Sequence, residues 1–250
     1  MPPFAALGAL QFLTRIPIRL RAAPDIAASV PWFPVIGALI GAAVGGVAAG
    51  LMEVVPAAVA AAVAVVVGMM VTGAFHEDGL ADTADAMGGF TPERRREILK
   101  DSRHGSYGVV AMVATVLIRV VSIAALNPAA AFAGLVAAHT LGRGAAVAVM
   151  GLAHPVPTEG LGADYARSLT PGRAVTGVLA SLGLGALAVG WWVLPLAGAV
   201  GIGALLVSVI AQRAFGGVSG DILGAVEQVG ECLALIIVSG LVAHHTVWWA

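Results

Sequence analysis

The sequence predicts an all-α protein: a polytopic helical bundle in a membrane, with about seven transmembrane helices and an amphipathic helix at the amino terminus. Of its 250 residues, 59% are hydrophobic and 11% are charged, and the mean hydropathy is +0.96. Soluble proteins carry about 25% charged residues, so this composition excludes a soluble domain and a disordered chain. The net charge of −1 also argues against a basic nucleic-acid-binding protein.

The charged residues are clustered, and the stretches between the clusters are long enough to cross a membrane. The residues before Arg15 are expected to form a surface helix rather than a signal peptide, because their uncharged stretch is short. Spans are then expected at 26–52, 54–75, 105–126, 129–153, 174–212 and 232–249. The stretch 174–212 is too long for one crossing and is expected to turn near Trp191, Trp192 and Pro195. In the first span, a set of small residues predicts close helix packing: Gly37, Gly41, Gly45 and Gly46.

The basic residues predict the orientation. Placing Arg15, Arg19 and Arg21 in the cytoplasm brings nearly all other basic residues there as well. We therefore predict one membrane-embedded domain over residues 1–250, with cytoplasmic loops at 76–107, 154–172 and 214–231. The single cysteine, Cys232, excludes an internal disulfide and matches no zinc-site spacing.

The strongest chemical signal is the acidic segment 76–85, HEDGLADTAD, directly after the second span. On a helix, Asp78, Asp82 and Asp85 share one face. A divalent cation would remove the repulsion between their carboxylates, and carboxylate oxygens suit Mg²⁺. The alternative is a solvated acidic start of a helix, favoured by the helix dipole.

A second segment, 100–108 or KDSRHGSYG, combines cations, hydroxyl groups and glycines. Lys100, Ser102 and Arg103 could present charges and hydrogen-bond donors to a phosphate group. The alternative is that their charge only marks the cytoplasmic side of the membrane. The arginines at 94–96 alternate with glutamates and are expected on a surface helix.

A third segment, 216–225 or GGVSGDILGA, places Asp221 between glycine-rich backbone and an apolar helix. An unpaired carboxylate there is costly, which favours a cation partner, although Asp221 could simply cap the helix. For Arg143, within a span, pairing with an acid and contact with a substrate phosphate remain equally open. A structural ion pair is favoured for Arg119. His76, next to the acidic cluster, is a candidate general base or a structural residue.

Together with FLTRIP at 12–17, these three segments resemble the cobalamin synthase family, the adenosylcobinamide-GDP ribazoletransferases, in order and overall chain length. The sequence departs from the family's usual residues at Ala86, His104 and Ser219. The resemblance implies a multi-pass enzyme of the bacterial inner membrane that requires Mg²⁺. In the implied reaction, a hydroxyl of α-ribazole or its 5′-phosphate attacks the phosphorus of adenosylcobinamide-GDP and releases GMP. This is the last assembly step of cobalamin biosynthesis.

On this basis we assign expected roles to the residues of the three segments. The expected metal ligands are Glu77, Asp78, Asp82, Asp85 and Asp221. The expected substrate-binding residues are Lys100, Ser102, Arg103 and Arg143. The expected catalytic residues are Asp82, Asp85 and His76, the last two as candidates to accept the proton of the attacking hydroxyl. The expected partners are the two substrates and the lipid bilayer, with no nucleic acid, and the small-residue faces also permit a homo-oligomer.

Two other functions compete with this interpretation. A CDP-alcohol phosphotransferase would use the same metal chemistry, but its alanine-arginine pair is absent here, where Ala81 and Asp82 stand. A cation or proton transporter predicts acidic residues near the middle of the spans. Here the acidic residues are expected at one face of the membrane.

Overall fold

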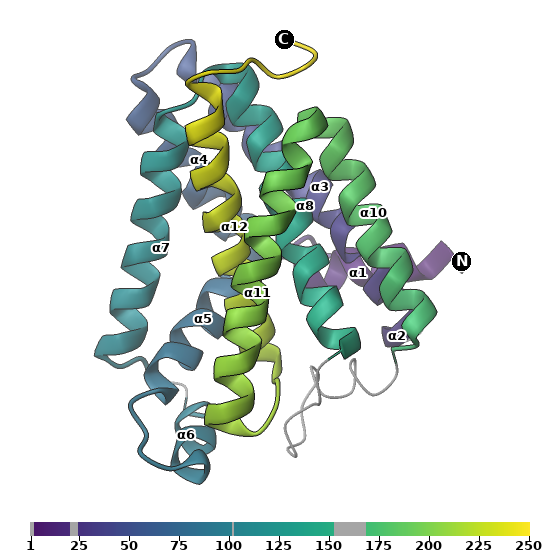
Figure 1. Cartoon of the computed structure of the whole chain (residues 1–250), viewed down its shortest axis with the longest axis vertical. Coiled ribbons are helices and arrows are strands. Elements are labelled where there is room, and N and C mark those ends of the chain that lie inside the picture. Colours follow the sequence, from purple (N-terminus) through teal and green to yellow (C-terminus); the bar gives the residue numbers. More distant parts are fainter. Residues whose placement is uncertain (1–2, 21–24, 102, 153–168) are drawn as a thin grey trace.

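The computed structural model describes residues 3–20, 25–101, 103–152 and 169–250, and these residues form helices without any strand. The described helices are α1 (Pro3–Leu13), α2 (Ile26–Ser29), η1 (Val30–Trp32), α3 (Phe33–Met52), α4 (Ala57–Thr72), α5 (Phe75–Ala86), α6 (Pro92–Ile98), α7 (Ser106–Ala124), α8 (Pro128–Leu152), α10 (Pro171–Val189), η2 (Gly190–Trp192), α11 (Val193–Phe215) and α12 (Gly220–Val242). The long helices run up and down the bundle in alternation (Figure 1). The all-helical membrane bundle predicted from the sequence is confirmed.

Five described segments are long and apolar enough to cross a membrane, and a sixth is added if α4 and α5 count as one bent span. One of the five, Pro171–Phe215, is divided by η2 into α10 and α11, which run in opposite directions (Figure 1). The turn lies at the tryptophan pair, as predicted. With α10 and α11 counted separately and α4 included, the described residues give about seven apolar helices, as expected.

Helix α8 lies at the centre of the bundle and packs against α3, α10, α11 and α12. Three glycines of α3 allow the closest approach. A Cβ atom on Gly37 would lie 2.5 Å from the carbonyl oxygen of His139, and one on Gly41 would lie 2.6 Å from that of Leu135. Gly45 faces α8 in the same way, whereas Gly46 faces open space. The predicted close packing is therefore made by three of the four glycines.

The amino-terminal helix forms, but its character differs from the prediction. Its only polar side chain is that of Gln11. Ala5, Ala9 and Leu13 on the same helix are buried. Helix α1 is thus an apolar helix packed on the bundle, not an amphipathic one, because its outward side also carries apolar residues such as Phe4.

The last span was predicted wrongly. It was expected at 232–249, but α12 begins at Gly220 and ends at Val242. Much of the predicted loop 214–231 is therefore helical, and Glu227 and Glu231 are buried in the bundle. The prediction failed because it excluded charged residues from spans, while these two acids have partners inside the bundle. Most of the predicted loop 154–172, and Arg21, lie outside the described residues.

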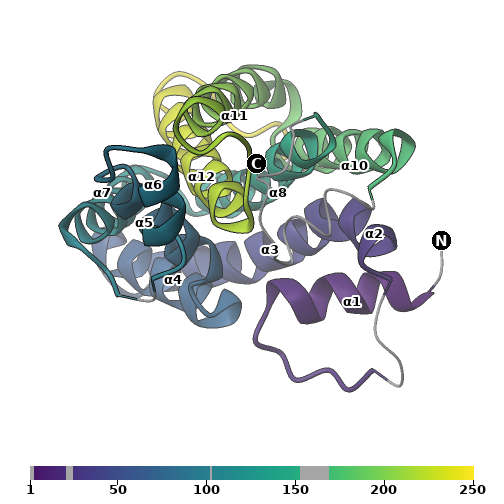
Figure 2. The ribbon, with the colours of Figure 1, turned by 90° about the horizontal axis from the view of Figure 1, so that it is seen from below.

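The acidic segment forms a helix of its own at one end of the bundle. After α4, Gly73 and Ala74 both have a positive φ, of 69° and 55°, and the chain turns by 90° into α5. We take α4 as the span and charged α5 as lying outside it. Seen from this end (Figure 2), α5 lies among α4, α6, α7 and α12. The predicted loop 76–107 is therefore largely helical, containing α5, α6 and the start of α7.

Candidate functional site

The acidic segment forms the helix α5, and two of its three predicted aspartates lie close together. Asp78 and Asp82 are one helical turn apart, and their side chains are 61% and 16% exposed. His104, just before α7, lies against both of them. Its Nε2 atom is 3.5 Å from Oδ1 of Asp78 and its Nδ1 atom is 3.7 Å from Oδ1 of Asp82. Ligand atoms of these three residues lie within 4.8 Å of one another, so they could hold a metal ion.

Two glycines bring Asp221 to this face. A Cβ atom on Gly79 would lie 2.8 Å from the carbonyl oxygen of Asp221, and one on Gly224 would lie 3.2 Å from that of His76. The start of α12 therefore packs directly on α5. Ser219 caps α12 by accepting a hydrogen bond from the N–H of Ile222, and its hydroxyl donates one to Oδ2 of Asp221 (3.4 Å). The charge of Asp221 still acts on Asp82.

The electrostatics of this face favour a cation. Partial burial, together with the charges of Asp78 and Asp221, raises the pKa of Asp82 to about 6. The raised pKa means that ionising the Asp82 carboxylate costs free energy in this arrangement. A divalent ion beside Asp78 and Asp82 would remove the cost, and hard oxygen ligands are the kind that Mg²⁺ prefers.

Asp85 has a different environment from the other two aspartates. Its Oδ2 atom accepts a hydrogen bond from the N–H of Gly105 (2.6 Å), and its Oδ1 atom accepts one from the N–H of Gly108 (2.8 Å). A Cβ atom on either glycine would overlap the Asp85 carboxylate. The two glycines of the second segment thus make room for Asp85, which holds α7 onto α5. In the described part of the chain, Asp85 and Asp221 are not among the residues whose ligand atoms converge.

The expected phosphate-binding residues lie on the exposed connection between α6 and α7. Lys100 is exposed, and Arg103 is paired with Asp101 through Nη2 and Oδ2 at 2.6 Å. Ser102 lies outside the described residues. Helix α6 is held in place by Arg96, which donates a hydrogen bond to the carbonyl oxygen of Phe215 (2.9 Å). This connection leads directly into His104 and so to the acidic face.

Glu77 and His76 do not face the aspartates. Successive helical residues point about 100° apart, and these two project from α5 into the bundle. Oε1 of Glu77 is 3.0 Å from Nη2 of Arg119, and Nδ1 of His76 is 3.6 Å from Oε2 of Glu227. The structure therefore disagrees with Glu77 as a metal ligand. Burial lowers the pKa of His76 to about 3, which makes it a weak base, and its enclosed side chain also argues against the expected role as general base.

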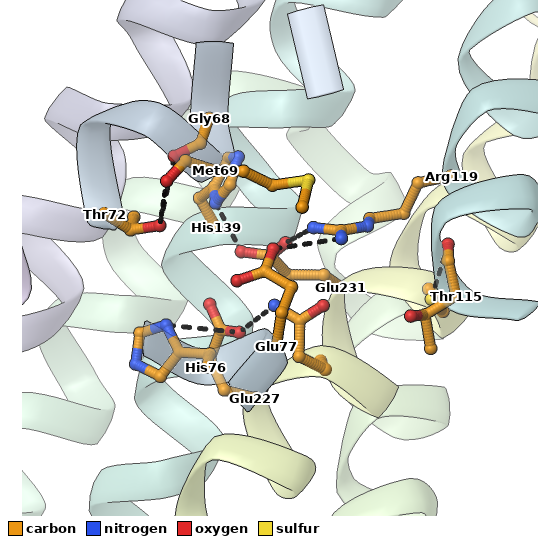
Figure 3. A network of polar contacts seen from close by, with 12 residues as sticks. Gly68, Met69, Thr72, His76, Glu77, Thr115, Arg119, His139, Glu227 and Glu231 are labelled. Carbon is orange, nitrogen blue, oxygen red and sulfur yellow. Dashed lines mark hydrogen bonds and ion pairs between the residues drawn. The ribbon is translucent and has the colours of Figure 1, made fainter. Parts of the chain in front are cut away.

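Instead, both residues belong to a buried network of charges (Figure 3). Arg119 of α7 contacts Glu231 of α12 as well as Glu77, with Nη1 and Oε2 3.3 Å apart. Arg143 of α8 pairs with both acids of α12, Glu227 and Glu231. The network thus joins α5, α7, α8 and α12.

The contacts of this network bear on the roles of Arg119 and Arg143, for each of which the sequence left two alternatives. Arg119 makes the predicted structural ion pairs. Arg143 is 2% exposed, and its Nη1 atom pairs with Glu227 and Glu231, which favours the ion pair over the expected contact with substrate. His139 also contacts Glu231, and ligand atoms of His139, Glu227 and Glu231 lie close enough together to hold a metal ion. The guanidinium of Arg143 pairs with both glutamates and supplies positive charge there.

Sequence reasoning overlooked the partners of these arginines. A signal was present, because Glu227 and Glu231 are spaced by four residues on one helix, and His139 and Arg143 are spaced by four on another. Acids do therefore lie inside the spans, contrary to the expectation used against a transporter. Buried arginines neutralise them, so they do not resemble an open ion pathway.

A cleft of about 380 Å³ adjoins the acidic face and shares Asp78 with it. Its other walls are Gln11 and Phe12 on α1, Thr14 and Arg15 just after it, and the turn from Thr72 to Phe75. The FLTRIP segment, whose role the sequence did not reveal, thus lies beside the acidic residues.

Comparison with known proteins gives consistent matches. A family model described as cobalamin-5-phosphate synthase matches residues 5–239. An adenosylcobinamide-GDP ribazoletransferase of Bradyrhizobium diazoefficiens is 42% identical over 67% of this chain and 65% of its own length, just under two thirds. A protein of the same name from Stutzerimonas stutzeri is 38% identical over 92% of this chain and 95% of its own length. Another, from Shewanella frigidimarina, is 33% identical over 93% of this chain and 94% of its own length. No solved structure matches the chain.

Proposed function

The chain belongs to the cobalamin-5-phosphate synthase family, and from this membership we propose that it is an adenosylcobinamide-GDP ribazoletransferase. It would join adenosylcobinamide-GDP to α-ribazole, or to α-ribazole 5′-phosphate, and release GMP. The family match over nearly the whole chain is the observation that carries this proposal. The acidic face of α5 supports it, since the chemistry of those side chains suits transfer at phosphorus.

The reaction breaks a phosphoanhydride bond and forms a phosphate ester bond. A hydroxyl oxygen of the acceptor forms a bond to the phosphorus next to adenosylcobinamide, and the bond from that phosphorus to GMP breaks. GMP leaves with the electron pair, and the hydroxyl proton passes to a base. Negative charge grows on the leaving phosphate, so cations placed there accelerate the transfer.

We propose that Asp78 and Asp82 hold Mg²⁺, with Asp221 adding negative charge beside them. When bound, Mg²⁺ would neutralise phosphate oxygens during the transfer. His104 lies against both aspartates, and Asp85 keeps α7 and His104 in position. Because His76 is enclosed and Asp85 is occupied by two N–H groups, Asp78 and Asp82 are the carboxylates of α5 that an acceptor hydroxyl can reach.

We also propose that this end of the bundle faces the cytoplasm of a bacterial inner membrane. Arginines 94, 95, 96 and 103 and Lys100 lie on α6 and its connection to α7, and Arg173 and Arg213 lie where α10 begins and α11 ends, all toward the same end of the bundle (Figure 1). The opposite end carries Glu53, where α3 ends. This asymmetry follows the tendency of lysine and arginine to remain on the cytoplasmic side.

The test is a reaction with purified protein, adenosylcobinamide-GDP and α-ribazole, with and without Mg²⁺. GMP release is measured together with the mass of the corrinoid product. We expect both products, and only when Mg²⁺ is present. Formation of both without any divalent metal would refute the metal assignment, whereas reaction of CDP-alcohols in place of the corrinoid would refute the substrate assignment.

A further inference from the structure

We propose that the cleft beside Asp78 binds the phosphorylated acceptor nucleotide, and that Arg15 contacts its phosphate group. This inference rests on the proposed function and adds to it a binding site for one of the two substrates. At about 380 Å³, the cleft falls within the range of roughly 300–1,000 Å³ usual for small-molecule sites.

Arg15 is a cation without an acidic partner among the described residues. This distinguishes it from Arg103 and Arg143, which are both paired with acids. Its side chain is exposed and lines the cleft. A free guanidinium matches the geometry of a phosphate group, to which it can donate two parallel hydrogen bonds.

The backbone around Arg15 is arranged to hold it at this place. Its N–H donates a hydrogen bond to the carbonyl oxygen of Val71 (2.8 Å), which fastens the end of α1 to the end of α4. Its side chain lies across Gly73, where an added Cβ atom would overlap the Nε atom. Gly73 also has a φ of 69°, so both its conformation and the space above it favour glycine.

The rest of the cleft suits the other parts of a nucleotide. Phe75 is 42% exposed and packs edge-on against Phe12, with ring centroids 5.2 Å apart, so it offers an aromatic surface to a base. Asp78 belongs both to the cleft and to the acidic face, which places an acceptor hydroxyl near the site of transfer. The phosphate, the base and the hydroxyl of a nucleotide are thus matched by Arg15, Phe75 and Asp78 respectively. The corrinoid of the other substrate is far larger than a nucleotide, which favours the acceptor as the occupant.

The test compares Arg15→Ala with the wild type, using α-ribazole 5′-phosphate and unphosphorylated α-ribazole as acceptors. Loss of a charged contact predicts a KM for the phosphorylated acceptor about 10-fold to 100-fold higher. The KM values for α-ribazole and for adenosylcobinamide-GDP should remain within about twofold of wild type. Arg19→Ala is the matched control, because Arg19 is an exposed arginine of the same segment that does not line the cleft.

Other results would overturn the inference. A higher KM for adenosylcobinamide-GDP with both acceptors would assign Arg15 to the diphosphate of the donor. Unchanged kinetics, as in Arg19→Ala, would remove Arg15 from the site. Should Arg15→Ala fail to fold, Arg15→Lys serves instead, and it too must weaken only the phosphorylated acceptor. If the wild type forms no product at all, the proposed function fails, and calorimetric binding of α-ribazole 5′-phosphate to wild type and Arg15→Ala still tests the cleft separately.

Discussion

Asp82 is the more enclosed of the two aspartates that we propose as metal ligands. Its carboxylate is 16% exposed, and its neighbours raise its pKa to about 6. We predict that Asp82→Asn, which keeps the shape but removes the charge, lowers GMP release by at least about 100-fold, because metal ions contribute several kcal/mol to such reactions. The measurement is turnover at saturating Mg²⁺.

A matched control is available close by in the sequence. Asp101→Asn removes an exposed carboxylate that pairs with Arg103 and lies outside the converging group. This variant should keep turnover within a few-fold of wild type. Equal losses in both variants, or full turnover in Asp82→Asn, would contradict the proposed role of Asp82.

For single residues, the sequence predicted the acidic face because the spacing of its aspartates is a local property of one helix. It could not predict that Glu77 points away, since the partner Arg119 is 42 positions along the chain. His104 was likewise passed over as a departure from the family pattern. Only the packing of α7 on α5 brings it between Asp78 and Asp82.

Among the helices, the contact between α5 and α7 depends on Gly108. A Cβ atom there would overlap the Asp85 carboxylate and lie 2.8 Å from the carbonyl oxygen of Ala81. We predict that Gly108→Ala shifts α7 and the preceding His104, and lowers turnover by about 10-fold or more, since small misplacements are costly in catalysis. Gly183→Ala is the control, because a Cβ atom there meets no other atom within 4 Å. Normal turnover in Gly108→Ala would show that this close contact is not required.

The buried charge network should contribute to stability as well as to the position of α5. Arg119→Ala leaves Glu77 and Glu231 without the guanidinium that now lies between them. Removing one partner of a buried pair costs about 3–5 kcal/mol. Chemical unfolding in detergent should therefore show a large loss of stability.

An exposed ion pair offers the comparison for this network. Arg94→Ala breaks a surface pair with Glu97 on α6 and should change the unfolding free energy by no more than about 1 kcal/mol. Similar effects of the two substitutions would mean that the network adds little. The same network explains the wrong prediction for α12, whose acids are tolerated in a span because Arg119 and Arg143 come from neighbouring helices.

Across the whole molecule, the proposed chemistry is confined to one end of the bundle. Helices α5 and α6 lie toward one end, and α3 ends with Glu53 at the other (Figure 1). The acidic face lies on α5, and the cleft shares Asp78 with it. Hydropathy predicted the helical membrane bundle correctly, since it acts over long segments, and the placing of the chemistry at one end stays a prediction. The exact ends of the helices depend on side-chain partners and could not be obtained in this way.

This polarity predicts a pattern of chemical labelling. The single cysteine, Cys232, is buried, so Cys232→Ala gives a background without thiols. Glu53→Cys and Glu93→Cys then place one thiol at each end, since both side chains are exposed. If the site faces the cytoplasm, a membrane-impermeant maleimide added to spheroplasts labels only Glu53→Cys, and both variants react after lysis. Labelling of Glu93→Cys alone before lysis would reverse the orientation and place adenosylcobinamide-GDP binding outside the cell, where GDP-activated substrates are not made.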